Sequence, residues 1–152
     1  MMKKTTNKLT EILKKTSPEK IDAFFTEYEE EVLEKDRPFP TYIRTLVKQK
    51  NLHFQEVFLR ADISEGYGYK LISGEKHTRQ RDTIIKLCLG AACTLNELQR
   101  ALKIYGMSPL YARFPRDAIL ISAISSGIYD LTEINKLLQK HGQPLLRGSE
   151  EL

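Results

Sequence analysis

The stretch ADISEGYGYKLISGEKHTRQRD, residues 61–82, places three glycines and a group of basic side chains between two apolar helical patterns. A glycine inside a helix costs up to about 1 kcal/mol relative to alanine. Residues 64–73 contain two such glycines, so intrinsic preference does not stabilise a helix there. We therefore expect a helix over 64–73 that is held in place by its neighbours.

Helix start and stop signals divide the region around this stretch. Apolar side chains at helical spacing predict one helix from Thr41 to about residue 50 and a shorter one over 53–61. Ser64 is a suitable N-cap, and Gly74 is a suitable helix stop. The sequence therefore predicts two short helices that are joined by a turn of two residues.

The formal charge of +4 is unevenly distributed along the 152 residues. Residues 1–40 carry 8 Lys or Arg and 9 Asp or Glu, residues 41–90 carry 9 and 5, and residues 91–152 carry 7 and 6. The excess lies mainly in the middle third, which is compatible with binding the phosphate backbone of DNA without requiring it. The acidic run 29–31 is either a solvated face or a segment that lies against this basic third.

The composition argues against several classes of protein. No apolar run approaches the length of about 18 residues that a membrane span needs, and the N-terminus lacks the apolar core of a secretory signal. We expect a cytoplasmic protein that does not bind membranes. Two cysteines and three scattered histidines match neither a disulfide framework nor a zinc pattern, so Cys88 and Cys93 are interpreted as buried hydrophobic side chains. An enzyme is the least supported class and no cofactor is implied, since the sequence has no glycine-rich phosphate loop and no nucleophile–base pair.

The first part of the chain, residues 1–38, is predicted to be an N-terminal helix and a linker. Ser17 and Pro18 fit a helix start. Apolar side chains follow at helical spacing, namely Ile21, Phe24, Phe25, Tyr28 and Val32. Pro38 and Pro40 are then expected to mark a joint before the main domain, because proline does not continue a helix.

An internal repeat covers residues 81–146. The segment that begins at Arg81 aligns with the segment that begins at Arg116, at an offset of 35 residues that slips to 36. Arg-Asp opens both copies, and a capping box is predicted at Thr94 and again at Asp130. We therefore predict two helical hairpins that stack on the preceding helices, with each aspartate near a helix dipole and each arginine paired across the hairpin.

Two short helices, a tight turn, a glycine, basic residues and an apolar helix follow one another in the order of a helix-turn-helix DNA-binding unit. In that arrangement the helix over 64–73 is the recognition helix and enters the major groove. Its exposed first turns meet base edges, and the loop after it contacts phosphates. The predicted DNA-binding residues are Ser64, Glu65, Tyr67, Lys70, Lys76, His77, Arg79 and Arg81.

Several of these contacts have a structural alternative. Tyr67 is expected on the exposed face of the recognition helix, but Tyr67 or Tyr69 can instead fill the core volume that Gly68 leaves. Glu65 either accepts a hydrogen bond from a cytosine amino group or compensates the helix dipole. Arg81 either contacts a phosphate or pairs within the repeat.

The stretch EVFLRADISEGYGYKLISGEKHTRQRDTIIKLCLG resembles the phage-repressor-like helix-turn-helix family, the XRE-type regulators. Ile63 and Ser64 match the family's apolar residue and capping serine, Leu71 its core residue, and Gly74 its glycine ten residues after the cap. A broader pattern over 39–146 looks like a group of small bacterial proteins described as XRE-like. The resemblance implies an all-α fold with a lambda-repressor-like helix-turn-helix core, and a role in transcription regulation.

The sequence departs from the pattern of that family at four positions, one of which is Phe54, where the family has a glutamine that contacts a phosphate. Phe58 stands where the family usually has a small alanine, Asp62 replaces a glycine or similar residue of the turn, and Gly68 replaces a core aliphatic side chain. These departures bear on the angle at which the two helices cross.

The leading hypothesis is an all-α, bacterial, cytoplasmic regulator that binds double-stranded DNA, as a homodimer on two half-sites. It divides into an N-terminal helix and linker over 1–38, a helix-turn-helix domain over 39–90 and a helical extension over 91–152 packed on that domain. The alternative is a helical interaction or adaptor module that binds a protein partner and no DNA. In that case Gly66 and Gly68 allow a partner chain to approach closely.

Overall fold

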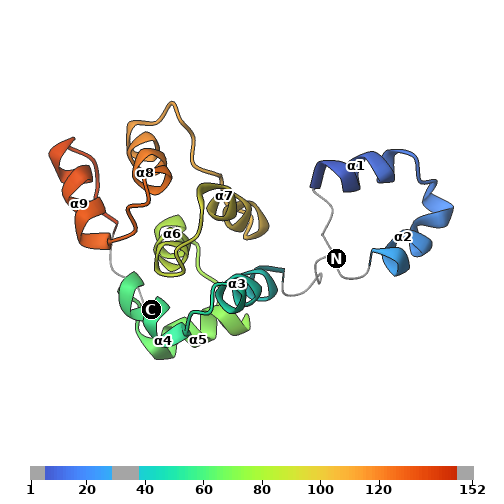
Figure 1. The fold of residues 1–152 in the computed structure, drawn as a ribbon, viewed down its shortest axis with the longest axis horizontal. Helices are drawn as coiled ribbons and strands as arrows, with labels where there is room; N and C mark the ends of the chain where they lie inside the picture. The colour runs from blue at the N-terminus through green and yellow to red at the C-terminus, as the bar shows by residue number, and fades with distance from the viewer. Residues whose placement is uncertain (1–5, 29–37, 147–152) are drawn as a thin grey trace. The chain divides into compact units, whose positions relative to one another are not determined.

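The computed structural model describes residues 6–28 and 38–146, and every regular element in those two ranges is a helix (Figure 1). No strand occurs in the described ranges, so the all-α prediction is confirmed. The chain divides into two compact units, Met1–Asp36 and Arg37–Leu152.

The smaller unit contains α1 (Thr6–Lys14), a 3-10 turn (Pro18–Lys20) and α2 (Ile21–Glu27). Pro18 stands at the first helical position, as predicted, but α2 is shorter than the predicted helix, and α1 is an element that the sequence did not predict. Phe24 is the one buried side chain among the described residues of this unit. The predicted continuation to Val32 and the acidic run 29–31 lie outside the described residues.

The larger unit begins with α3 (Pro38–Gln49), which starts three residues before the helix predicted from Thr41. Pro38 and Pro40 lie in the first turn of α3, where the backbone N–H groups have no acceptor within the helix. The two prolines therefore start this helix, and the boundary between the two compact units, after Asp36, falls just ahead of them as predicted. The side chains that it buries are those of Phe39, Pro40, Ile43, Leu46 and Val47.

The next two helices are α4 (Phe54–Ala61) and α5 (Glu65–Ser73), which the predicted tight turn joins. Ser64 is the N-cap of α5, because the Tyr67 N–H donates to its Oγ at 3.4 Å. Gly74 ends the helix in the left-handed conformation, with a φ of 82°. The predicted start and stop of this helix are confirmed.

Phe58 and Gly68 fit one another where α4 packs against α5. The Phe58 ring lies so close to the α5 backbone that a Cβ atom on Gly68 would stand 2.6 Å from a ring carbon. A large side chain on α4 thus fills the space that the missing side chain on α5 leaves. The departures from the family pattern at Phe58 and Gly68 therefore compensate for one another in volume. Asp62, the third departure, adopts a φ of 55°, which aspartate tolerates better than most residues.

The predicted hairpins are formed by α6 (Arg81–Gly90) with α7 (Leu95–Ile104) and by α8 (Pro115–Ser125) with α9 (Leu131–Lys140). Helix α6 packs against both α4 and α7 and is buried without interruption over residues 83–90. It is the central helix of the larger unit (Figure 1). Cys88 and Cys93 are free and buried, as predicted.

Capping differs between α7 and α9. The Glu97 N–H donates to the Thr94 hydroxyl and the Thr94 N–H donates to the Glu97 carboxylate, so the capping box predicted there is confirmed. At α9 the Asp130 carboxylate accepts from the Thr132 N–H at 2.9 Å, one residue earlier than a capping box requires. The predicted start of α9 is correct, and its cap is of another kind.

Reciprocal ion pairs join the two hairpins at their Arg-Asp openings. Arg116 donates to both carboxylate oxygens of Asp82 at 2.8 Å, and Arg81 donates to both oxygens of Asp117. Each arginine also donates to backbone carbonyls of the loop that ends its own hairpin. These carbonyls belong to Ser108 and Pro109 for Arg81, and to Pro144 and Leu145 for Arg116. The two ion pairs are reciprocal and join one hairpin to the other, whereas each arginine was predicted to pair across its own hairpin.

Lys86 lies at the centre of the buried helix α6. Its exposed fraction is 0 %, and its Nζ has no hydrogen-bond partner among the described residues. Loss of water around the ammonium group lowers the pKa of Lys86, against smaller opposite contributions from Asp62 and Asp82. The sequence shows this lysine only as an interruption of an apolar run.

Replacing Lys86 with methionine is expected to raise the free energy of unfolding at neutral pH, because the folded protein then holds no buried ammonium ion. In the wild-type protein the folded-state pKa of Lys86 lies below its unfolded-state value. The cost of the charge is therefore complete below the folded-state pKa and disappears as the pH rises toward the unfolded-state pKa. Urea unfolding can be measured at several pH values from neutral to alkaline. The free energy of unfolding of the wild-type protein should approach that of Lys86→Met as the pH rises. A difference that stays constant with pH would contradict this.

Candidate nucleic-acid interface

Helix α5 turns one face toward the core and another toward solvent. Its buried residues are Tyr67, Gly68, Leu71 and Ile72, and its exposed residues are Glu65, Gly66, Tyr69 and Lys70. Tyr67 is therefore a core side chain, and the prediction that it is exposed is wrong. The contact between Phe58 and Gly68 fixes the inward face of α5, and Tyr67 lies beside Gly68 on that face.

Tyr69 occupies the exposed position that was expected for Tyr67. It is 45 % exposed, and its ring packs edge-on against Phe58 at 5.0 Å between centroids. Phe58 in turn stacks on Phe54 at 5.6 Å. This aromatic row fixes the Tyr69 ring on α5, and the sequence showed Tyr69 only as a second candidate for the core.

The basic loop, residues 74–80, folds back onto the end of α5. The Lys76 N–H donates to the Lys70 carbonyl at 3.0 Å, and this hydrogen bond ties the loop to the last turn of the helix. The side chains of Lys70, Lys76 and Arg79 are exposed, and none of them forms an ion pair with a described acid. These three residues are the unpaired cations of the candidate interface.

Tyr105, at the end of α7, anchors the basic loop to the hairpins. Its hydroxyl accepts the Thr78 N–H at 2.7 Å, and its ring stacks on His77 at 4.4 Å and meets Phe39 edge-on at 4.9 Å. Burial raises the pKa of Tyr105, and the hydrogen bond from Thr78 lowers it less. His77 thus remains exposed, but its ring serves to hold the loop. Sequence reasoning missed this anchor because 27 residues separate its two sides.

Replacing Tyr105 with phenylalanine is expected to destabilise the basic loop, because the Thr78 N–H loses its acceptor in a part-buried position. The expected cost is about 1–3 kcal/mol. Hydrogen exchange should show the Thr78 amide losing protection, and urea unfolding should show the loss of stability. The exposed Tyr111 serves as the control, since Tyr111→Phe should change neither quantity. Unchanged protection of Thr78 in Tyr105→Phe would contradict the anchor.

Arg81 is not part of the unpaired set. Its guanidinium donates to both oxygens of the buried Asp117 carboxylate, with one Nη–Oδ distance of 3.2 Å, and to two loop carbonyls. These contacts use the donors that a phosphate would need, so the assignment of Arg81 to DNA is corrected to a structural one. Ser64 and Glu65 remain exposed at the start of α5, and Ser64 acts there as the cap.

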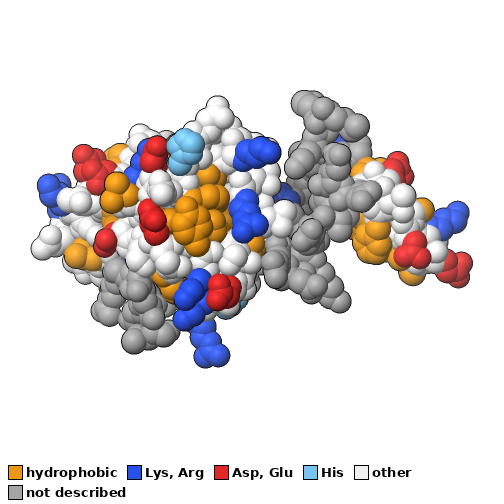
Figure 2. Space-filling view, turned by 90° about the horizontal axis from the view of Figure 1, so that it is seen from below, with side chains coloured by type: hydrophobic (Ala, Val, Ile, Leu, Met, Phe, Trp, Pro, Cys, Tyr) orange, Lys and Arg blue, Asp and Glu red, His pale blue; other side chains and the backbone are white. Residues whose placement is uncertain are grey.

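The surface around α4 and α5 carries charges of both signs. Figure 2 looks at the molecule from the side on which these helices lie, and it shows apolar side chains near the middle of the larger unit with Lys, Arg and acidic side chains beside them. Leu59 of α4 is 83 % exposed. The acidic residues nearest in sequence to the unpaired cations are Glu65, Glu75 and Asp82. Glu65 and Glu75 are exposed, and Asp82 is paired with Arg116.

The fold thus defines an all-helical protein with a small helical unit and a larger one that is built around a buried central helix. No known family model, curated protein or solved structure matches the chain. Within residues 6–28 and 38–146, no helix has the length and apolar character to cross a membrane. The same two ranges hold no group of three His, Cys, Asp or Glu side chains arranged to bind a metal ion.

Proposed function

We propose that the protein is a bacterial, cytoplasmic regulator that binds double-stranded DNA through α4, the turn 62–64 and α5, used as a helix-turn-helix. The observation that carries the proposal is the set of three unpaired cations, Lys70, Lys76 and Arg79, on the exposed side of α5 and in the loop after it. Cations that need not first be separated from a protein acid are free to displace counterions from phosphates.

In this proposal the contacts divide between positioning and reading. Lys76 and Arg79 bind phosphates, while the exposed face of α5 lies in the major groove. Tyr69 and Lys70 meet base edges or sugars, and Glu65 either accepts from a cytosine amino group or compensates the helix dipole. A single module of this size makes few contacts, so we expect two copies to bind two half-sites.

The test is the salt dependence of binding to duplex DNA, measured by fluorescence anisotropy. The triple variant Lys70→Ala, Lys76→Ala, Arg79→Ala should lose affinity, and the slope of log affinity against log salt should fall by roughly 0.9 for each phosphate contact removed. A matched triple variant at exposed cations elsewhere in the larger unit, Lys103→Ala, Arg113→Ala, Lys140→Ala, should change little. Equal behaviour of the two variants, or no binding to random duplex at low salt, would refute the proposal.

The second candidate function is a protein-interaction or adaptor module. The observation that favours it is the apolar exposure on α4 and α5, where Leu59 is 83 % and Tyr69 is 45 % exposed. Exposed apolar side chains of this kind contribute to protein interfaces more than to phosphate contacts. A chain that is not retained on DNA or heparin, and that binds a defined protein partner in a manner abolished by Leu59→Asp, would favour this function over DNA binding.

A further inference from the structure

The connection between α7 and α8 presents two exposed aromatic rings. Tyr111 is 43 % exposed and Phe114 is 60 % exposed, and the two rings meet edge-on at 5.0 Å between centroids. In Figure 1 this connection lies at the outer edge of the larger unit, away from α4 and α5. Exposed apolar side chains that lie together mark an interaction site more often than single ones do.

Hydrogen bonds fix this connection on both sides of the rings. The Gln99 side chain accepts the Leu110 N–H at 2.7 Å and donates to the Leu110 carbonyl at 2.9 Å. The Tyr111 N–H donates to the Asp117 carboxylate at 2.9 Å, and the Phe114 N–H donates to the Tyr111 carbonyl at 3.0 Å. Because the rings are already held in place, a partner that binds them loses less conformational entropy than it would on a loose loop.

The loop that ends the second hairpin adds a third exposed apolar side chain beside these rings. Arg116, two residues after Phe114, donates to the carbonyls of Pro144 and Leu145, each at 2.9 Å. Leu145 is 41 % exposed. Three of the five large apolar side chains that are exposed in the described part of the larger unit therefore belong to this end of the second hairpin.

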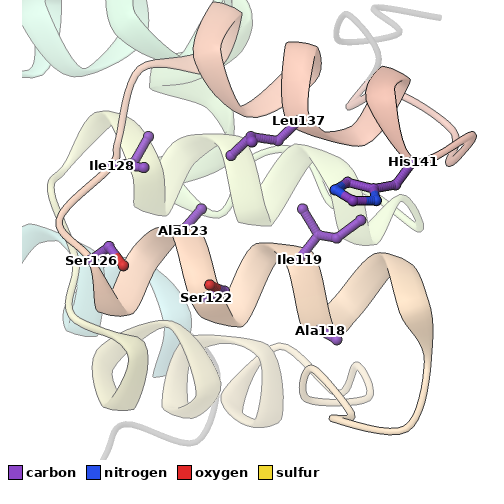
Figure 3. A pocket seen from close by; sticks show the side chains of 8 residues that line it. All are labelled: Ala118, Ile119, Ser122, Ala123, Ser126, Ile128, Leu137 and His141. Carbon is purple, nitrogen blue, oxygen red and sulfur yellow. The ribbon is translucent and has the colours of Figure 1, made fainter.

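A groove of about 390 Å³ between α8 and α9 begins at the same end. Its lining is mainly apolar and includes Ala118, whose N–H donates to the Phe114 carbonyl one helical turn away, at 2.8 Å. In Figure 3 the side chains of Ile119, Leu137 and His141 point into the space between the two helices. The volume lies within the range of about 300–1,000 Å³ that is usual for ligand pockets.

The corresponding face of the first hairpin holds a helix. The residues equivalent to part of the groove lining are buried there, namely Ile84, Cys88 and Ala101, the counterparts of Ile119, Ala123 and Leu137. Helix α3 packs against that hairpin, and its Phe39 ring meets Tyr105, the counterpart of His141, at 4.9 Å between centroids. We therefore expect the second hairpin to accept the same kind of element, an amphipathic helix.

The exposed charges at this end of the second hairpin are positive. Segments 109–118 and 137–146 contain a single acid, Asp117, which is 1 % exposed and paired with Arg81. Glu133, the acid of α9, lies in the first turn of that helix, at the opposite end of the hairpin. The exposed cations of the two segments form no ion pair with a described acid, and they are Arg113 and Lys140. This charge favours an acidic partner.

We propose that this end of the second hairpin binds an acidic amphipathic helix of a partner protein. Apolar side chains of that helix enter the groove and contact the Tyr111 and Phe114 rings, and its carboxylates face Arg113 and Lys140. A helix fits better than a nucleic acid does, because the groove walls are aliphatic and are covered by apolar side chains more readily than by phosphates or sugars. The inference goes beyond the proposed function, because it does not depend on whether the protein binds DNA.

The test selects peptides from a random displayed library on the immobilised full chain. The selected peptides should combine apolar side chains at helical spacing with Asp and Glu. Their affinity, measured by fluorescence anisotropy, should fall at least about tenfold in Phe114→Ala and in the double variant Arg113→Ala, Lys140→Ala. All three side chains are exposed, so the variants should keep the unfolding transition of the wild-type protein. The matched controls on the other surface should bind normally, and they are Leu59→Ala and the double variant Lys70→Ala, Lys76→Ala.

Two substitutions at one position of the groove separate charge from shape. Ser122 is exposed and lines the groove. Ser122→Glu should weaken binding of the selected peptides at least about tenfold, whereas Ser122→Lys, with a side chain of similar length, should keep or strengthen it. An equal loss in both variants would overturn the acidic chemistry of the partner.

Other outcomes would overturn the proposal as a whole. They are a library that enriches no peptide, enrichment of neutral or basic peptides, and affinities that Phe114→Ala leaves unchanged. Self-association of the chain that Phe114→Ala abolishes would assign the surface to a second copy, and binding of single-stranded DNA with the same sensitivity would assign it to a nucleic acid. Failure of duplex DNA binding with the peptide results intact would refute only the proposed function.

Discussion

Gly90→Ala is expected to lower the free energy of unfolding by about 3 kcal/mol, at the upper end of the usual cost of overpacking. A Cβ atom on Gly90 would stand 2.3 Å from the carbonyl oxygen of Val57 and 3.2 Å from the Ala61 side chain. The obstacle is the backbone of α4, which cannot turn aside as a flexible side chain can. The two helices would have to separate at the centre of the larger unit. Urea unfolding followed by circular dichroism measures the effect.

The matched control is the same substitution at Gly66. A Cβ atom there meets no atom within 4 Å, and the residue lies inside α5 on its exposed face. Gly66→Ala should therefore raise the free energy of unfolding by about 0.5–1 kcal/mol, because alanine restricts the unfolded chain and favours the helix. If both substitutions lowered the free energy of unfolding, the close approach of α4 and α6 would not be the cause of the loss at Gly90.

Asp117→Ala is expected to destabilise the protein by about 1.5–3 kcal/mol, because the part-buried Arg81 guanidinium and the Tyr111 N–H both lose their acceptor. Asp117 is 1 % exposed and accepts hydrogen bonds from the Arg81 guanidinium and from the Tyr111 N–H at 2.9 Å. Its removal frees the arginine, the loop amide and the opening of the second hairpin together. Differential scanning calorimetry should show a lower melting temperature with the transition still cooperative.

Two comparisons separate this network from ordinary surface charge. Glu56→Ala breaks the exposed pair that Glu56 forms with Arg60 at 3.2 Å and should cost less than about 1 kcal/mol. Asp82→Ala breaks the reciprocal pair with Arg116. Hydrogen bonds to Asp82 are the main cause of the raised pKa of Arg116. The loss of stability in Asp82→Ala should lie between the losses in Glu56→Ala and Asp117→Ala. A loss at Asp117 no larger than that at Glu56 would show that the reciprocal pairs do not hold the hairpins together.

Local chemistry was enough to predict the order and the bounds of most helices in the larger unit. Ser64 and Gly74 define α5, and Thr94 with Glu97 defines the start of α7, because caps act within one turn of the chain. The same local rules failed at the start of α3, where a proline that stops one helix equally well starts another. They also failed at α1, whose nine residues give a weak signal.

The candidate interface was less predictable, because exposure depends on contacts between distant residues. The sequence placed Lys70, Lys76 and Arg79 correctly on the surface, since long charged side chains rarely become buried. It misplaced Tyr67, because the choice between Tyr67 and Tyr69 as the core residue depends on the contact of Phe58 with Gly68.

The sequence by itself determined that this protein is all-helical, that its second half repeats, and that its middle third carries the excess positive charge. Only the tertiary structure decided which of those charges are unpaired. Arg81 is held by Asp117, 36 residues along the chain, while Lys76 and Arg79 meet no described acid. The physical reason is that helical periodicity and capping are short-range effects, whereas neutralisation of a charge requires an opposite charge brought close by the packing of the whole unit.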